Sequence, residues 1–181
     1  MRHEIIMSGF GGQGVLLMGQ IVAYAGMLEE KHVSWIPSYG PEMRGGTANC
    51  SVIITEGLPG SPMIEESTAA VVLNLPSLDK FEATVRANGV LIVNGSLIDK
   101  AVNRQDIKVY RVPVNDIAIE LGNLKMANMV ALGALIAATD AVEMEALFTA
   151  VAKKFAAKPQ VIEVNKAAIK RGYDYIKNNI A

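Results

Sequence analysis

Two loops of this chain carry residue types and spacings that could bind an anion. The first, Gly9-Phe10-Gly11-Gly12-Gln13-Gly14, matches the pattern G-x-G-x-x-G between an expected strand and an expected helix. Positions without side chains permit a tight turn, and they let backbone N–H groups approach an anion next to the partial positive charge of the helix. We therefore expect Gly9, Gly11, Gly12, Gln13 and Gly14 to help bind a phosphate, a diphosphate or a carboxylate.

The first loop lacks the acid that a dinucleotide site requires. Such a site places Asp or Glu at the end of the second strand, about 20 residues further on, to bind the ribose hydroxyls. Here the second strand ends in Ser34-Trp35-Ile36-Pro37, while Glu29 and Glu30 precede it. This disfavours an NAD-dependent dehydrogenase, and glycines needed only to pack a helix against a sheet remain an alternative.

The second loop, Ser38-Tyr39-Gly40-Pro41-Glu42-Met43-Arg44-Gly45-Gly46-Thr47, follows the second expected strand. In an open α/β sheet, ligands usually bind at this carboxyl edge. Arg44 beside Gly45 and Gly46 offers a planar guanidinium next to exposed backbone amides, which suits phosphate or carboxylate. The alternative is a rigid turn in which Arg44 pairs with Glu42 at the surface.

The other reactive side chains stand alone, so we expect no catalytic and no metal-binding residue in this chain. His3 and His32 start strands without Asp, Glu or Cys at metal-ligand spacing, and Ser8 has no adjacent His to activate it. Cys50 is the single cysteine, in an expected strand, and suits a small core residue. An iron–sulfur cluster needs about four thiolates, so this chain alone cannot hold one.

Strands and helices alternate along the first part of the chain, and helices follow. This order predicts a three-layer α/β/α fold with a mainly parallel sheet, in which residues 47–55 run antiparallel because no helix precedes them. The glycine loop after the first strand is Rossmann-like, and the C-terminal part is helical. The expected strands are 4–8, 33–36, 47–55, 69–75, 90–93 and 108–112, and the expected helices are 15–28, 76–88, a short one capped by Asn115 or Asp116 that stops at Gly122, 126–138, 144–155 and 160–176.

Composition predicts one cytoplasmic domain, residues 1–181. Hydrophobic residues make up 51% and charged residues 19%, which suffices for a buried core, and the net charge of -1 suggests no nucleic-acid partner. The longest apolar run, residues 129–138, is half of the roughly 20 residues of a membrane span, and no signal peptide is evident. From residue 150 onward the charge is +5, which indicates a solvated helical face or a basic docking surface for an acidic partner.

The two loops resemble the gamma subunit of 2-oxoacid:ferredoxin (acceptor) oxidoreductases. Gly-Phe-Gly-Gly-Gln-Gly-Val after the first strand and Pro-Ser-Tyr-Gly-Pro-Glu-Met-Arg-Gly-Gly after the second carry the likeness. Later segments agree, and the resemblance covers essentially the whole chain. These later residues are Asn128, Met129, Val130 and Gly133, then Asn165, Ala168 and Gly172.

The resemblance implies a heteromeric complex with alpha, beta and often delta chains. Such a complex decarboxylates a 2-oxoacid on thiamine diphosphate with Mg²⁺, passes electrons through iron–sulfur clusters to ferredoxin, and releases an acyl-CoA. Members act on pyruvate, 2-oxoglutarate, branched-chain 2-oxoacids or arylpyruvates, and the chain length and overall likeness lean towards 2-oxoglutarate. This chain has no Gly-Asp-Gly triplet for a thiamine diphosphate site. We expect it to be inactive alone, and its exposed apolar surface to favour self-association.

Within such a complex, the glycine loops are expected to form part of the coenzyme A site or the wall of the active site. Coenzyme A carries a diphosphate and a ribose phosphate, which suit the backbone amides of residues 11–14 and the guanidinium of Arg44. Asn128, a lone polar residue in an apolar helix, should have a partner if buried and could fix one loop. The alternatives are a free-standing nucleotide- or CoA-binding protein and a purely structural assembly module.

Overall fold

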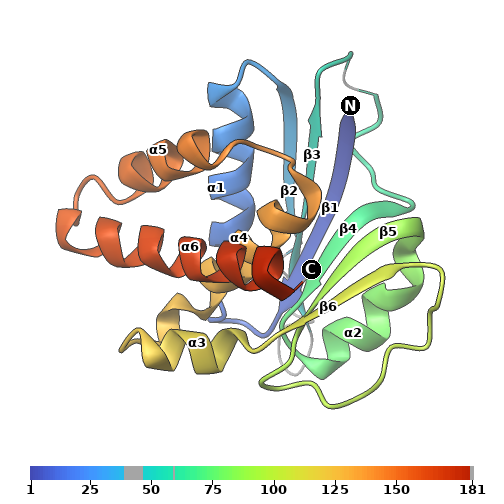
Figure 1. Ribbon diagram of the computed structural model, residues 1–181. Coiled ribbons are helices and arrows are strands. Elements are labelled where there is room, and N and C mark those ends of the chain that lie inside the picture. Colours follow the sequence, from blue (N-terminus) through green and yellow to red (C-terminus); the bar gives the residue numbers. More distant parts are fainter. Residues whose placement is uncertain (39–46, 59, 180–181) are drawn as a thin grey trace.

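The computed structural model describes residues 1–38, 47–58 and 60–179. A six-stranded mixed sheet in the order β2-β3-β1-β4-β5-β6 forms its centre (Figure 1). The parallel pairs β1–β4, β4–β5 and β5–β6 make up one half, and β3 runs antiparallel to both β1 and β2. The strands are β1 (Arg2–Gly9), β2 (His32–Ser38), β3 (Ala48–Thr55), β4 (Ser67–Val72), β5 (Val85–Asn94) and β6 (Lys108–Val112).

The antiparallel direction of β3 confirms the prediction for residues 47–55. Because β3 runs opposite to the other strands, its first residue lies at the edge where those strands end. In the register, Ala48 pairs with Gly9 of β1, and Asn49 pairs with Ser38 of β2. The carboxyl ends of five strands and the amino end of β3 therefore share one edge of the sheet, which we call the carboxyl edge.

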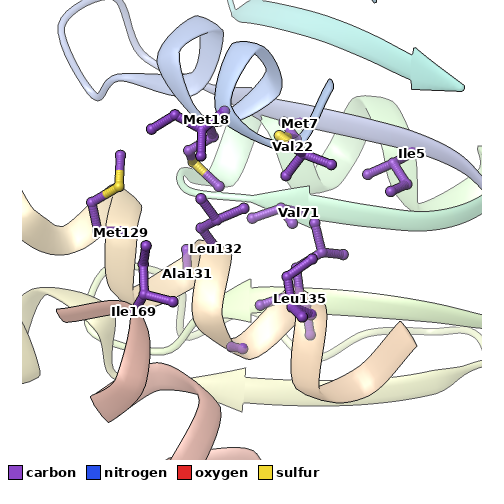
Figure 2. Close-up of a cluster of buried hydrophobic side chains, with 14 of the residues drawn as sticks. Ile5, Met7, Met18, Val22, Val71, Met129, Ala131, Leu132, Leu135 and Ile169 are labelled. Carbon is purple, nitrogen blue, oxygen red and sulfur yellow. The ribbon is translucent and has the colours of Figure 1, made fainter. Parts of the chain in front are cut away.

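Most of the helices lie on one face of the sheet (Figure 1). They are α1 (Val15–Leu28), α4 (Ala127–Thr139), α5 (Met144–Lys154) and α6 (Ile162–Asn179), with the short α3 (Val114–Glu120) before α4. Figure 2 shows side chains of α1 and α4 meeting strand residues in the main core, among them Met18, Val22, Leu132, Leu135, Met7 and Val71. Burial of such side chains away from water drives this packing.

Helices α4 and α6 approach each other backbone to backbone. A methyl group added at Gly133 would collide with the backbone of Ile169, and one at Gly172 would collide with the backbone of Val130. The two glycines thus serve the same contact from opposite sides, because only a residue without a side chain lets the backbones come this near. This contact fixes α4, and with it the first turn of α4 near the carboxyl edge.

The opposite face has a smaller core under the short helix α2 (Leu75–Phe81). Leu78 and Phe81 of this helix pack on strand side chains that include Ile6 and Val93. Two helical layers therefore enclose the sheet, as predicted for a three-layer α/β/α fold. The helical C-terminal part is also confirmed, since α4, α5 and α6 follow the last strand.

The predicted helix over residues 76–88 is wrong beyond Phe81. A 3₁₀ turn, Glu82–Thr84, follows α2, and β5 begins at Val85, which pairs with Ser67 of β4. Pairing with the neighbouring strand overrides the local helical pattern here. Gly89, expected to stop the helix, lies within β5, where a methyl group would come within 3.0 Å of the Thr68 carbonyl oxygen.

Basic residues of the C-terminal region form separate ion pairs in the described part of the chain. Lys166, Lys170, Arg171 and Lys177 each form an ion pair with a carboxylate. On α5, Lys153 donates to the Tyr24 hydroxyl at 3.1 Å, and Lys154 donates to the Gln20 side chain at 2.7 Å.

Within the ranges that the structure covers, no helix is long and apolar enough to span a membrane.

Candidate functional site

The glycine loop joins the end of β1 to the start of α1 and is held by its own hydrogen bonds. Gly12 and Gly14 have φ angles of 90° and 76°, which lie in the region that favours glycine. The Gln13 backbone N–H donates to the Phe10 carbonyl at 3.1 Å. The Gln13 side-chain oxygen in turn accepts from the Phe10 N–H at 2.6 Å. Gly9 is buried beneath this turn, and Gly11 is exposed on it.

Asn128 connects this loop to α4. Its side chain is 5% exposed, and its Nδ2 donates to the Gly14 carbonyl at 3.3 Å. A methyl group at Gly14 would collide with the same amide, so the glycine is needed for close approach as well as for its φ angle. The expectation that Asn128 would be buried with a partner, and would fix a loop, is therefore confirmed. A role for Asn128 in binding a ligand stays a prediction.

The second loop lies mostly outside the described residues. Arg44, Gly45 and Gly46, which were predicted to bind an anion, all fall in that gap. The strand residues on either side of the gap are described, and they pair next to the glycine loop: Ser38 with Asn49, and Ala48 with Gly9. The two predicted loops thus start or end at the same edge of the sheet.

A cavity of about 410 Å³ opens at the carboxyl edge beside the glycine loop. Gly12 and Gln13 contribute to its wall, as do residues that follow β4, β5 and β6 and the start of α4. Its lining is rich in side-chain amides and includes one lysine. The lining residues are Gly12, Gln13, Leu73, Asn94, Val114, Asn115, Asn123, Leu124, Lys125, Ala127 and Asn128.

A chain of amide contacts ties the strand ends together under this cavity. Asn94, 1% exposed at the end of β5, donates from Nδ2 to the Leu73 carbonyl at 3.2 Å. The same Nδ2 donates to Oδ1 of Asn115 at 2.9 Å, and Oδ1 of Asn94 accepts from the Ser96 N–H at 3.1 Å. Buried polar groups satisfied in this way hold one arrangement of the loops.

The sequence did not single out the four other polar residues of the lining, Asn94, Asn115, Asn123 and Lys125. Of these, only Asn115 was given a role, as one of two candidate caps of a short helix. The cap prediction is wrong, because α3 begins at Val114 after Pro113, with no side-chain cap. Asn115 instead bonds to Asn94. One signal could have found two of them: Asn94 ends β5, Asn115 follows β6 closely, and the ends of neighbouring parallel strands meet at one edge.

The other nucleophilic side chains serve the fold. Ser8 is fully buried, and its hydroxyl lies 2.8 Å from that of Ser77 and 3.3 Å from the Ala48 carbonyl. Burial raises the pKa of the Cys50 thiol to about 12, and the thiol donates to the Val15 carbonyl at 3.4 Å. Cys50 is therefore a protonated core residue rather than a nucleophile.

His3 lies near the start of β1, at the opposite end of that strand from the cavity. Burial, and next the charge of Lys31, lowers the pKa of its imidazole. Among the described residues, no group of three His, Cys, Asp or Glu side chains comes together to hold a metal ion.

One buried amide donor at the carboxyl edge is unpaired within the described ranges. Asn74 follows β4, is 2% exposed, and caps α2 by accepting from the Ser77 N–H at 2.9 Å. Its Nδ2 has no hydrogen-bond partner among the residues that the structure covers. A buried donor without a partner lowers the stability of the fold by about 1–3 kcal/mol. The amide nitrogen of Asn74 is such a donor at the carboxyl edge, within the described ranges.

Comparison with known proteins identifies the family of this fold and sequence. The family model described as pyruvate ferredoxin/flavodoxin oxidoreductase matches residues 4–175. Ketoisovalerate oxidoreductase subunit VorA from Methanothermobacter marburgensis is 35% identical over 98% of this chain, which spans 37% of VorA. 2-oxoglutarate synthase subunit KorC from Methanocaldococcus jannaschii is 34% identical, over 98% of this chain and 95% of KorC.

A solved structure agrees with these sequence relatives. The gamma subunit of a keto/oxoacid ferredoxin oxidoreductase from Geobacter sulfurreducens superposes with a TM-score of 0.86 and 32% identity. The match covers 97% of this chain and 99% of that subunit. The resemblance carried by the two loops is thereby confirmed, and the chain belongs to the pyruvate ferredoxin/flavodoxin oxidoreductase family.

Proposed function

We propose that this chain is the gamma subunit of a cytoplasmic complex that oxidatively decarboxylates a 2-oxoacid to an acyl-CoA. Electrons pass from the complex to ferredoxin or a similar acceptor. The family match and the end-to-end similarity to a gamma subunit support this proposal. The observation that carries it is the glycine loop, held beside an amide-lined cavity at the carboxyl edge whose described lining residues include no nucleophile and no acid.

The reactive groups belong to partner chains in this proposal. The residues present do not fit thiamine diphosphate, since the sequence has no Gly-Asp-Gly triplet, nor an iron–sulfur cluster, since its one cysteine is buried and protonated. Alpha and beta chains, with a small delta chain, would supply thiamine diphosphate, Mg²⁺ and the clusters. The isolated gamma chain is then catalytically silent.

This chain contributes part of the coenzyme A site or of the wall around it. Backbone N–H groups of Gly11, Gly12 and Gly14 at the amino end of α1 suit the phosphates of coenzyme A. Arg44, with Gly45 and Gly46, would add a guanidinium and further amides from the neighbouring loop. The contact between Asn128 and Gly14 holds the first loop in place for this role.

The substrate we favour is 2-oxoglutarate, ahead of pyruvate and branched-chain 2-oxoacids. The end-to-end likeness to a KorC subunit supports this choice, since KorC has about the same length as this chain. VorA, named for ketoisovalerate, is much longer than the matched region. A panel of the three 2-oxoacids on the assembled complex tests this order directly.

The test is reconstitution with the partner chains under anaerobic conditions. We expect CoA-dependent and 2-oxoacid-dependent reduction of an electron acceptor only when this chain joins the complex, and no turnover by this chain alone. In the complex, Arg44→Ala should raise the KM for coenzyme A about tenfold while assembly stays intact, as expected for the loss of a charged hydrogen bond.

Two experimental outcomes would contradict this proposal, and each would support a different function. A chain that joins no complex and binds adenine nucleotides by itself would be a free-standing nucleotide- or CoA-binding protein. A complex in which Arg44→Ala and Gly12→Val leave the KM for coenzyme A unchanged, while weakening assembly, would make this chain a structural module.

A further inference from the structure

Helix α1 carries no charged side chain along its whole length. A helix at a protein surface usually places charged residues on the side that faces water, and a helix that is apolar all round is usually buried. The residues of α1 that stay at least partly exposed follow one another around a single side of the helix, so they form one stripe. They are Leu16, Leu17, Gln20, Tyr24, Met27 and Leu28. The stripe therefore has the composition of a covered surface, although no described part of this chain covers it.

A groove of about 450 Å³ borders this stripe, between α1 and the neighbouring helix α5 (Figure 1). The groove is apolar at its base and basic along its α5 side, and none of its described lining residues is Asp or Glu. The lining residues are Gln20, Ile21 and Tyr24 of α1, with Ala150, Lys153 and Lys154 of α5. On α5 itself, the acidic Glu145 lies about two turns before Lys153 and does not line this groove.

The two lysines are held at the groove by neutral partners. Nζ of Lys153 donates to the Tyr24 hydroxyl at 3.1 Å and lies 5.5 Å from the centre of the Tyr24 ring. Nζ of Lys154 donates to Oε1 of Gln20 at 2.7 Å. An ammonium group has three N–H donors, so both lysines keep donors that these contacts do not use. Within the described ranges neither lysine forms an ion pair, whereas the basic residues of α6 described above do.

We propose that the groove between α1 and α5 binds an acidic segment of another subunit of the complex. Carboxylates of that segment pair with Lys153 and Lys154, and its apolar side chains cover Tyr24, Met27 and Leu28. Pairing with a carboxylate supplies the charged partner that both ammonium groups lack within the described part of this chain. The choice of another subunit as the occupant rests on the function proposed above.

The apolar stripe favours a permanent subunit over a transient electron carrier. Permanent interfaces are larger and more hydrophobic than transient ones. An electron carrier also has to approach a redox centre, and the single cysteine of this chain is too few for an iron–sulfur cluster. The lysines then determine which segment binds, because opposite charges across an interface suppress wrong partners and fix the register.

Charge reversal at the two lysines tests the acidic nature of the partner. In the double variant Lys153→Glu/Lys154→Glu, carboxylates of the groove face carboxylates of the bound segment. Met27→Glu places a charge in the apolar stripe at a position that is 60% exposed. All three positions are exposed, so the isolated variants should fold, which circular dichroism checks. Lys108→Glu makes the same reversal at an exposed position of β6, the edge strand farthest from β2, and serves as the matched control.

The assay measures binding of each purified chain to the remaining subunits of the complex. We expect the double variant to bind about 100-fold more weakly than the wild type, since loss of one close charge pair alone costs about tenfold or more. Met27→Glu should weaken binding about tenfold, and Lys108→Glu should bind as the wild type does. Carbodiimide cross-linking of the wild-type complex should join Lys153 or Lys154 to Asp or Glu of another subunit, and mass spectrometry then identifies the segment.

The possible results lead to different conclusions. A wild-type chain that joins no complex refutes the proposed function, and the docking site with it. A double variant that binds as tightly as the wild type leaves the proposed function standing and rejects the docking site. Unchanged assembly with a raised KM for the electron carrier would assign the groove to that carrier, and cross-links to a second copy of this chain alone would assign it to self-association. Both of these results refute the docking of another subunit.

Discussion

Replacing Gly172 by alanine tests the backbone contact between α4 and α6. The new methyl carbon would lie 2.8 Å from the Val130 carbonyl carbon and 3.1 Å from the Ala134 nitrogen, with the Val130 oxygen nearer still. Backbone atoms cannot swing aside as a side-chain tip can. The two helices would therefore have to move apart over the buried contact that joins them.

The expected cost follows from two opposing effects. Forcing an extra methyl into a packed interior costs typically about 1–3 kcal/mol and occasionally more, and an overlap with backbone belongs at the upper end of that range. Alanine is about 1 kcal/mol better than glycine in a helix interior, which offsets part of the cost. We therefore expect Gly172→Ala to lower the free energy of unfolding by about 2–3 kcal/mol. For a chain of this length, that lowers Tm by about 4–12 °C.

Thermal unfolding followed by circular dichroism, with urea unfolding as a second measure, checks this value. Gly26→Ala in α1 is the matched control, because its methyl would meet side-chain carbons of Val33 and Ile54 at 3.0 and 3.3 Å rather than backbone. We expect the control to cost less than about 1 kcal/mol, since side chains can adjust. A Tm for Gly172→Ala equal to that of the wild type, or above that of Gly26→Ala, would refute the backbone contact.

Three further predictions concern single side chains. Asn128→Leu removes the amide that holds Gly14, so the free energy of unfolding should fall by about 1–3 kcal/mol and amide hydrogen exchange in residues 9–14 should speed up; unchanged exchange would contradict the anchoring role. Because burial lowers the pKa of His3, the native state binds fewer protons than the unfolded state below pH about 6.5, so stability should fall as the pH drops from there through the folded-state pKa. The urea midpoint of His3→Gln should depend less on pH in that window, and equal pH dependence would exclude His3 as its source. Cys50, buried with a raised pKa, should react with a thiol reagent only after unfolding in urea; fast labelling of the native chain would show the thiol to be accessible.

The alternation of strands and helices could be predicted because the hydrophobic periodicity and the positions of glycine and proline indicated the same elements along most of the chain. Residues 15–28 form α1 as expected, since a long apolar run follows the glycine loop directly. The boundary between α2 and β5 could not be predicted in this way. Val85 pairs with Ser67 across the sheet, and that partner is distant in the sequence, so no local pattern reveals it.

The candidate site was predictable in part. Asn128 stood out because one amide in an apolar helix needs a partner, and the structure supplies the Gly14 carbonyl. Asn115, Asn123 and Lys125 did not stand out, because isolated polar residues near turns are common on any surface. They come together at one cavity only in the folded chain, where the ends of separate elements meet at the carboxyl edge.

The insertion of β3 between β2 and β1 has a consequence for how such a scaffold can diversify. Both ends of the segment between β2 and β3 are anchored by backbone pairing, Ser38 with Asn49 and Ala48 with Gly9, and backbone pairing is indifferent to side-chain identity. Substitutions within residues 39–47 should therefore leave the register of the three strands intact. What this segment recognises could then be altered by design without rebuilding the sheet.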